Sequence, residues 1–310
     1  MDFTRRQLEA VVEVAERRNI SHAAVELAVS QPTVSRLVSR VEAIVGTPLF
    51  ERDVNGAEPT RAGELFVEGA AEMLRRFDEV TDQIRSLEGR LVGKVCVAMP
   101  DTIGHTLFIP LIDRFARLHP DVELRVMASH PSNVPLALAS GDADVGVISD
   151  AHRNPGVSGT PLAIEQLHLV SAAGHAVGRR KTQVRLSDLA GVPLVLPAIQ
   201  PGLRNRIDAA FAQRQLRPSV VLEVDAEDAL VELVSSGRAH SIMSFAGVQR
   251  FVGRGQLDAQ VIVDPPIERL LSSAVPEGRA VTRLLATVAD AIHDLAEELA
   301  PAAHWSIPAK

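Results

Sequence analysis

Residues 21–50 constrain the fold of this chain most strongly, because they carry the pattern of a helix, a tight turn and a second helix. Small apolar residues at helical spacing (Ala23, Ala24, Leu27 and Ala28) give the first helix one apolar face, and Val29–Ser30 interrupts it. Gln31–Pro32 opens the second helix, with proline at a position where its missing N–H has no consequence. Its apolar face is formed by Val34, Leu37, Val38, Val41 and Val45, and its polar face by Thr33, Ser35, Arg36, Ser39 and Arg40. A short helix with hydroxyl and arginine side chains after a tight turn has the shape that enters a DNA major groove.

The neighbouring segments favour a small DNA-binding domain over residues 1–59. Any pair of amphipathic helices gives a similar pattern, so the motif alone is not specific. Residues 6–17 predict a preceding helix, with Leu8, Val11, Val12 and Ala15 directed inward. Residues 48–60 predict a wing, a short hairpin with a turn at Asn55–Gly56. The candidate DNA-contacting residues are Ser21, Gln31, Pro32, Thr33, Ser35, Arg36, Ser39, Arg40 and Arg52.

On these residues the chain resembles the LysR-type transcriptional regulators. The matching positions are Leu8, Ala15, Ala23–Ala24, Leu27, Ser30–Gln31–Pro32, Val34–Ser35, Glu42, Gly46, Pro48–Leu49–Phe50, Arg52, Thr60 and Gly63. The chain departs from the family at residues 19–21, where a serine, an aromatic residue and a threonine are more usual, although Asn19 or Ser21 can still cap the helix. The resemblance implies a regulator that binds double-stranded DNA as a homodimer or homotetramer and contacts RNA polymerase. It also implies that most of the remaining chain binds a small organic effector.

Composition agrees with a globular regulator. A length of 310 residues predicts two or three domains, and 46% hydrophobic with 23% charged residues is typical of a globular chain. The net charge of −7 argues against a protein that coats nucleic acid, whereas specific binding needs only local basic residues such as Arg61 and the arginines named above. No apolar run opens the chain or is long enough to span a bilayer, so we expect a cytoplasmic protein without a membrane partner. The single cysteine, Cys96, lies in an apolar run and is expected to be a buried small hydrophobe rather than a redox sensor.

Residues 61–87 predict one long helix with a heptad seam. Its apolar positions follow one another at alternating steps of four and three residues, and this period favours two helices packed side by side. The seam consists of Phe66, Ala70, Met73, Phe77, Val80, Ile84 and Leu87. A single helix laid against its own domain would need a similar stripe. We favour pairing between two chains, because the segment (residues 60–89) links two domains and has little else to cover its seam; residues 88–93 then break the helix.

Beyond residue 93, apolar strands alternate with amphipathic helices, which predicts parallel sheets covered by helices. The predicted strands are 94–98, 122–127, a third that follows a turn within 141–148, and 166–171, 194–196, 220–224, 241–244 and 267–274. The predicted helices are 105–118, 134–139, 203–213, 226–235 and 280–299. The fold class is therefore a winged helix-turn-helix, a linker helix and a two-lobed α/β effector domain over residues 90–300. Lobe I comprises residues 90–163 and 267–300, lobe II residues 164–266, and residues 301–310 form a tail.

The loops that follow the strands nominate a ligand site between the lobes. Thr102, Ser129 and Ser132 offer hydroxyls beside helix N-termini, where free N–H groups attract an anion, and Arg204 is a natural partner for a carboxylate. These four residues have an ordinary alternative, because serine and threonine there are often caps and a first-turn arginine often faces solvent. His130 could titrate with pH, but a role as a polar wall of the pocket is favoured. The candidate effector-binding residues are Asp101, Thr102, Ser129, His130, Ser132, Ile199, Gln200, Arg204 and Phe245.

No catalytic, cofactor or metal motif is convincing. The chain has no GxGxxG after a strand, no P-loop and no GxSxG, and its histidines lack metal-ligand spacing. Asp142 and Asp144 look like a carboxylate pair but are better explained as a turn before a buried strand. An enzyme for acyl or decarboxylation chemistry is the alternative class, and the absence of an activated nucleophile or an acid/base pair argues against it. A solute-binding protein would leave the winged helix unexplained. The sequence therefore predicts a DNA-binding regulator that senses a small, anionic metabolite.

Overall fold

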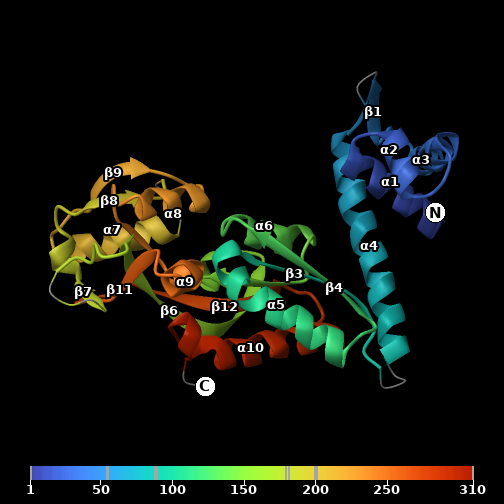
Figure 1. Cartoon of the computed structure of the whole chain (residues 1–310). Coiled ribbons are helices and arrows are strands. Elements are labelled where there is room, and N and C mark those ends of the chain that lie inside the picture. The colour runs from blue at the N-terminus through green and yellow to red at the C-terminus, as the bar shows by residue number, and fades with distance from the viewer. Residues whose placement is uncertain are drawn as a thin grey trace. The chain divides into compact units, whose positions relative to one another are not determined.

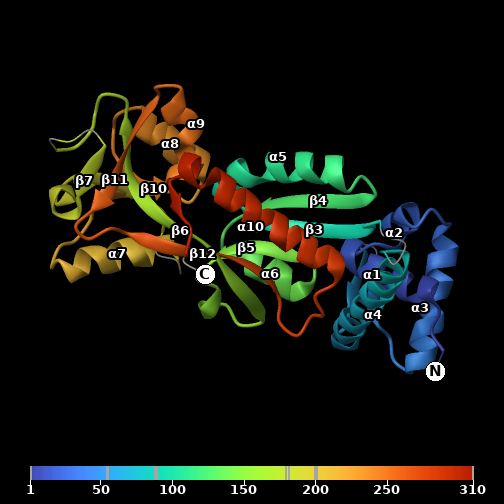
Figure 2. The ribbon, with the colours of Figure 1, turned by 90° about the horizontal axis from the view of Figure 1, so that it is seen from below.

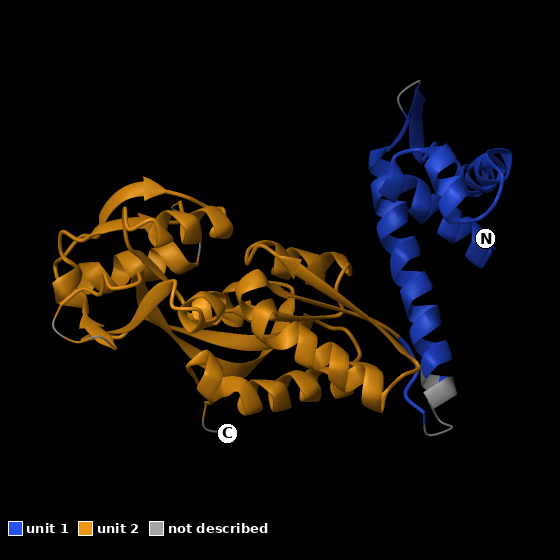
Figure 3. Ribbon diagram, in the orientation of Figure 1, with its two compact units in different colours: residues 1–93 blue, residues 94–310 orange. Residues whose placement is uncertain are grey.

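The computed structural model describes residues 2–53, 56–86, 90–178, 180, 182–198 and 202–308, without the side chains of Gln83, Arg85 and Ser86. The chain forms two compact units, residues 1–93 and 94–310 (Figure 3). The division falls at the end of segment 88–93, where the long helix was expected to break. No helix among the described residues is long and apolar enough to cross a membrane.

Unit 1 contains the predicted helices and hairpin (Figure 1). Its elements are α1 Arg5–Arg17, α2 Ile20–Glu26, α3 Gln31–Val45, β1 Phe50–Asp53, β2 Gly56–Pro59 and α4 Arg61–Ser86. A capping box of Thr4 and Gln7 opens α1. The side chain of Asn19 accepts the N–H groups of Ser21 and His22, so Asn19 rather than Ser21 caps α2.

The core of unit 1 is built from small apolar side chains of α1, α2 and α3. Val34, Val38 and Val41 of α3 are fully buried, as the pattern predicted, whereas Val45 is exposed. In α1, Val14 is fully buried although it was not predicted to face inward, and Val12 and Ala15 are only half-buried. The buried face of α1 is broader than one stripe because the helix packs against α2, α3 and α4.

The wing is a two-stranded antiparallel hairpin that is tied to α3 by one carboxylate. Phe50 pairs with Pro59 and Asp53 with Gly56. Glu42 Oε1 accepts the N–H groups of Leu49 (2.9 Å) and Phe50 (3.3 Å), and Glu42 Oε2 accepts Arg52 Nη2 at 2.9 Å.

Unit 2 is organised around a mixed sheet whose strand order is β4-β3-β5-β12-β6-β11-β7 (Figure 2). The strands are β3 Gly93–Pro100, β4 Val122–Ser129, β5 Val145–Ser149, β6 Val157–Ala172, β7 Gln183–Arg185, β11 Leu257–Val263 and β12 Glu268–Pro276. Strand β3 is parallel to β5, whereas β12 is antiparallel to both β5 and β6. Strand β10 (Ser241–Ser244) also pairs with β6, and β8 (Pro193–Leu196) forms a separate parallel pair with β9 (Ser219–Glu223).

Helices cover both sides of these strands. Helix α6 (Asn133–Ser140) lies on one side of β5, and α5 (Asp101–Leu118) packs with α10 (Arg283–Ala303) on the other (Figure 1). Lobe II contains α7 Leu203–Gln213, α8 Glu227–Ser235 and α9 Phe245–Gly253.

Several predicted boundaries in unit 2 are wrong. Strand β6 begins at Val157 rather than residue 166, because glycine, proline and polar residues at 158–161 obscure its first half in the sequence. Strands β7 and β11 and helix α9 were not predicted, and α5 begins at Asp101 instead of residue 105. The proposed tail at 301–310 is not separate: α10 continues to Ala303, and β13 (Trp305–Ser306) pairs with β6. Pro301 lies in the last turn of α10, and Trp305 is buried.

Cys96 and the Asp142–Asp144 turn have the structural roles that the sequence predicted. Cys96 is buried in β3, and burial raises the pKa of its thiol. Asp144 accepts the N–H of Cys96 at 2.7 Å and forms an ion pair with Arg279 at 2.7 Å. Asp142 accepts the hydroxyl of Ser140 at 2.6 Å.

The start of α4 depends on the absence of a side chain at residue 63. Thr60 Oγ1 accepts the N–H of Gly63 (3.0 Å), and the N–H of Thr60 donates to the carbonyl of Leu49 (2.9 Å). A Cβ atom at residue 63 would overlap that carbonyl oxygen. Gly69, one and a half turns later, has no neighbour within 4 Å of a Cβ position.

We therefore expect Gly63→Ala to destabilise unit 1 by about 1–3 kcal/mol through overpacking against fixed backbone. Gly69→Ala is the matched control and should stabilise the same helix by up to about 1 kcal/mol, because alanine is the better helix former. Urea unfolding followed by helical circular dichroism measures both. Equal midpoints for the two variants would show that the contact with Leu49 does not constrain the fold.

Candidate DNA-binding and effector-binding sites

The exposed face of α3 carries two arginines that differ in how they are held. Gln31, Pro32, Arg36, Ser39 and Arg40 are exposed, and the remaining predicted positions of this helix, Thr33 and Ser35, are half-buried. Arg36 Nε donates to the carbonyl of Pro32 at 3.3 Å, which holds the side chain along the first turns. Arg40 has no hydrogen bond or ion pair with any residue that the structure describes.

Two other predicted DNA contacts lie beside this face. Arg52 of the wing bonds Ser35 Oγ (3.3 Å) and Glu42 (2.9 Å), so its charge is already paired within the unit. Ser21 is exposed at the first turn of α2. These bonds thus hold the wing against α3. Among the described residues of this face, the guanidinium groups without a carboxylate partner are those on α3.

The predicted seam of α4 divides into a covered part and an exposed part. Ala70 is buried, and Phe66 packs edge-on against Phe3 with ring centroids 5.3 Å apart, so these two residues belong to the fold of unit 1. The positions further along the helix are exposed: Met73 (60%), Phe77 (61%), Val80 (42%) and Ile84 (61%). Leu87 lies outside the described residues.

An apolar groove adjoins this exposed stripe. It has a volume of about 330 Å³ and is lined by Phe3, Leu8, Val45, Ala62, Leu65, Phe66, Gly69, Ala70 and Met73. Arg5 lies over the ring of Phe77 at 5.2 Å and pairs with Asp78 at 2.7 Å. Met73 belongs both to the groove and to the stripe of exposed apolar residues that ends at Ile84.

In unit 2, the candidate residues of lobe I lie at strand ends, as predicted. Ser129 is the last residue of β4 and is half-exposed, and His130 and Ser132 are exposed. His130 Nδ1 lies 2.7 Å from Ser132 Oγ, so this hydroxyl bonds the histidine instead of capping α6. Within the described residues, the N-cap residues of α5 to α9 make no side-chain hydrogen bond to the first turn of their helices.

The N-termini of α5 and α8 meet at Gly247 of α9. A Cβ atom on Gly247 would lie 2.9 Å from both Glu227 Oε1 and Thr102 Cγ2. Burial raises the pKa of Glu227 to about 7, with further contributions from Asp101 and Asp228 that Arg250 and Arg269 oppose. Sequence reasoning proposed Asp101 and Thr102 but missed Glu227, although an acidic residue after a predicted strand was a usable signal.

Contacts between α5 and α9 also join the two lobes near Gly247. Gln249 Nε2 donates to Thr106 Oγ1 at 3.1 Å, and Arg250 Nη1 lies 3.5 Å from His105 Nε2. Arg250 is also 4.0 Å from Asp228.

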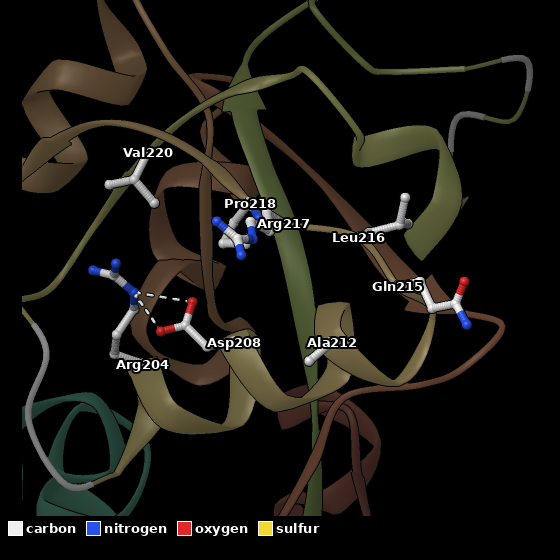
Figure 4. A pocket seen from close by; sticks show the side chains of 8 residues that line it. All are labelled: Arg204, Asp208, Ala212, Gln215, Leu216, Arg217, Pro218 and Val220. Carbon is white, nitrogen blue, oxygen red and sulfur yellow. Dashed lines mark hydrogen bonds and ion pairs between the residues drawn. The ribbon is translucent and has the colours of Figure 1, made fainter.

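Arg204 does not offer a free charge to a ligand, contrary to the prediction. Its guanidinium bonds Asp208 at 3.1 Å, Glu223 at 2.9 Å and the carbonyl of Pro197 at 2.9 Å. Burial lowers its pKa, but the two carboxylates outweigh burial and the pKa is raised overall. Arg204 lines an open surface pocket of about 650 Å³ between α7 and the segment before β9 (Figure 4). The other pocket-lining residues are Asp208, Ala212, Gln215, Leu216, Arg217, Pro218 and Val220.

The arginine of α7 that reaches lobe I is Arg206. It forms an ion pair with Asp150, which follows β5, and it donates to the carbonyl of Glu268 at 2.8 Å. Residues two apart on a helix face different directions, and the sequence pattern did not show which arginine pointed toward lobe I. Two further candidates, Ile199 and Gln200, lie outside the described residues.

Phe245 was predicted to lie on a loop after a strand, and this placement is wrong. It is the first residue of α9, and its ring stacks on His304 with centroids 3.7 Å apart and a 4° interplanar angle. His168 Nε2 lies 3.1 Å from His304 Nδ1. Burial, with help from His304, lowers the pKa of His168 to about 4, and burial also lowers the pKa of His304.

A buried polar cluster beside these rings was not foreseen. Glu165 has no exposed surface and accepts hydrogen bonds from Ser244 Oγ, Arg269 Nε and Trp305 Nε1. Nothing in the local sequence around Glu165 indicates this cluster, because its donors lie 79 to 140 residues away along the chain.

Two family models match the chain. Residues 5–64 match the bacterial regulatory helix-turn-helix protein, lysR family, and residues 88–297 match the LysR substrate binding domain. The chain is similar to the HTH-type transcriptional regulator BbuR of Bordetella bronchiseptica, with 27% identity over 81% of this chain and 77% of that protein. It is also 28% identical to a probable nitrogen assimilation transcriptional activator of Synechocystis, over 76% of this chain and 77% of that one.

Solved structures agree with this assignment. Full-length CbnR complexed with its target DNA has a TM-score of 0.68 and 25% identity, covering 95% of this chain and all of that one. A full-length OxyR variant from Pseudomonas aeruginosa has a TM-score of 0.72 at 22% identity, covering 96% and 95% of the two chains, and shows the same fold. These relatives are transcriptional regulators and not enzymes. The chain, with a helix-turn-helix unit followed by a substrate-binding α/β unit, belongs to the LysR family of transcriptional regulators.

Proposed function

We propose that this LysR-type regulator reads promoter DNA through the exposed face of α3, as a dimer, and that a small anion bound between the lobes of unit 2 modulates this binding. The observation that carries the DNA-binding part is the pair of exposed arginines on α3, Arg36 and Arg40, beside a wing whose own arginine is internally paired. A regulator of this kind acts in the cytoplasm, where its DNA and RNA polymerase are found. The functional division is a DNA-binding domain at 1–59, a linker at 60–89 and an effector domain from residue 90.

Arg36 and Arg40 should differ in what they contribute to DNA binding. Arg36 is near the N-terminal half of α3, where side chains reach base edges, so Arg36→Ala should relax sequence preference by about 1–3 kcal/mol. Arg40→Ala should weaken all duplexes alike and lower the salt slope by about one, as expected for a phosphate contact. An operator selected from random duplexes, titrated against a scrambled duplex at several salt concentrations, separates the two effects.

Arg117→Ala provides the control for that titration, because Arg117 is an exposed arginine in unit 2 and its loss changes the net charge equally. It should leave both affinities unchanged. If the Arg36→Ala protein keeps the wild-type ratio of specific to non-specific affinity, Arg36 does not read bases.

The apolar stripe of α4 supports the dimer. Four apolar side chains at seam positions are at least 42% exposed, which is a surface that a second α4 would cover. Phe77→Asp should dissociate the dimer, or weaken it by several kcal/mol, because pairing would bury an unpaired carboxylate. Light scattering across a dilution series measures the mass, with Val25→Asp as an equivalent exchange at an exposed valine of α2. A Phe77→Asp protein as associated as wild type would place the dimer contact elsewhere.

The N-termini of α5 to α9, whose described N-cap residues make no side-chain cap, support an anionic effector, because the partial positive charge of a helix N-terminus favours a carboxylate. Thr102 and Ser132 supply hydroxyls at two of these ends, whereas Arg204 and Arg206 are both already paired with carboxylates. A thermal-shift screen of metabolites on the full chain tests this: carboxylates should stabilise it, and their neutral amides should not. Stabilisation only by neutral or cationic compounds would refute the anion proposal.

Glu227 makes that binding depend on pH in a definite direction. Its pKa is raised to about 7, so the carboxyl is mostly neutral near pH 6 and mostly ionised near pH 8. Simple carboxylates stay ionised throughout this range. The affinity of the best carboxylate from the screen should therefore fall about tenfold (~1.4 kcal/mol) as pH rises, since the ionised Glu227 repels it. Calorimetry on Glu227→Gln should show a flat profile; a profile that still falls would show that Glu227 is not the source of the pH dependence.

A further inference from the structure

Glu165 lies at the point of β6 where the strand passes from one lobe to the other. Residues 157–166 of β6 pair with β12, and residues 167–172 pair with β10 and β11. At Glu165 the strand is paired on both sides, since Arg269 of β12 and Trp305 of β13 are its opposite neighbours. Both lobes therefore pair with the same short stretch of β6 around Glu165.

The side chain of Glu165 is held by donors from three separate elements. Ser244, at the end of β10, belongs to lobe II, and Arg269 lies on β12, the second strand between the lobes. Trp305 Nε1 donates at 3.1 Å from β13, which follows α10 of lobe I. All three donor residues are at most 8% exposed, and Glu165 is fully buried.

The segment that contains Trp305 also contacts lobe II directly. His304 stacks on Phe245, the first residue of α9, and bonds His168 of β6. Residues 304–306 thus span from the end of α10 to the first residue of α9 and are paired along β6 between them.

A buried carboxylate is stable only while its donors stay in place, because an ionised group without hydrogen bonds is strongly disfavoured in the interior. Rotation of lobe II about β6 and β12 would move Ser244 and Phe245 relative to Trp305 and His304. The arrangement of the lobes that satisfies Glu165 is therefore favoured over others.

We propose that residues 304–306 form a strap that sets the angle between the lobes, with Trp305 and His304 as positioning residues. This proposal depends on the proposed function in one respect only, namely that movement of the lobes transmits the effector signal. Its effect on the lobes is measured without any effector or DNA, so failure of the anion proposal would leave this measurement unaffected.

The test is the distribution of distances between spin labels on the two lobes of the full chain. Cysteines at Leu136 of α6 and Gln213 of α7, both exposed, carry the labels, and the buried Cys96 is replaced by alanine. Trp305→Phe keeps the aromatic ring and removes the N–H donor. We expect it to at least double the width of the distribution, while the Arg206–Asp150 and Gln249–Thr106 contacts still hold the lobes near one another.

Ile307→Ala is the matched control, because Ile307 lies on the same segment, is partly exposed, and should leave the distribution unchanged. His304→Asn is a second test that removes the stacking on Phe245 and retains a residue suited to the positive φ of 55° at this position. The His304→Asn protein should also give a broader distance distribution, so the proposal can still be tested if Trp305→Phe fails to fold. Folded Trp305→Phe and His304→Asn proteins with the wild-type width would overturn the strap.

Discussion

The arrangement of unit 2 depends on the continuous backbone pairing of one strand, β6. Because buried N–H and C=O groups must be hydrogen-bonded, a sixteen-residue strand that runs through both lobes requires a paired neighbour at every stage. Strand β12 supplies it over the first part, β10 and β11 over the second, and β13 completes the pairing at the transition. The two-residue β13 is short, yet its position at Glu165 gives it contacts with both lobes.

The partners of each arginine separate structural residues from contact residues more clearly than position along the chain does. Arg52, Arg204 and Arg269 are all paired with carboxylates of their own unit, and each fixes two elements together. Arg36 and Arg40 have no carboxylate partner among the described residues and project from a helix whose opposite face is fully packed. A charge that is already neutralised contributes little to recognition of an anion, because a ligand must first displace its partner.

How much was predictable from the sequence depended on the range of the interactions. The helix-turn-helix, the wing strands and the start of α4 follow from local signals, such as Pro32 at a helix start and Gly46 at a helix end, and these elements were predicted closely; Asn55 of the predicted turn lies outside the described residues. The directions of Arg204 and Arg206 at the start of α7 were not predictable from the sequence. They depend on the carboxylates that the fold brings near them, Glu223 of β9 for Arg204 and Asp150 after β5 for Arg206. The cluster around Glu165 is the extreme case, since each donor comes from a distant segment and one of them, Trp305, lies on β13, where only a tail was predicted.

The position of Trp305 has a spectroscopic consequence. The chain contains one tryptophan and no tyrosine, so its near-ultraviolet absorption and emission come almost entirely from a single indole. That indole is buried, and its N–H is bonded to the carboxylate of Glu165 at the junction of the two lobes. The intrinsic fluorescence of the unmodified protein therefore reports on the surroundings of this indole at the junction of the two lobes. It is an optical probe of that junction that needs no added label.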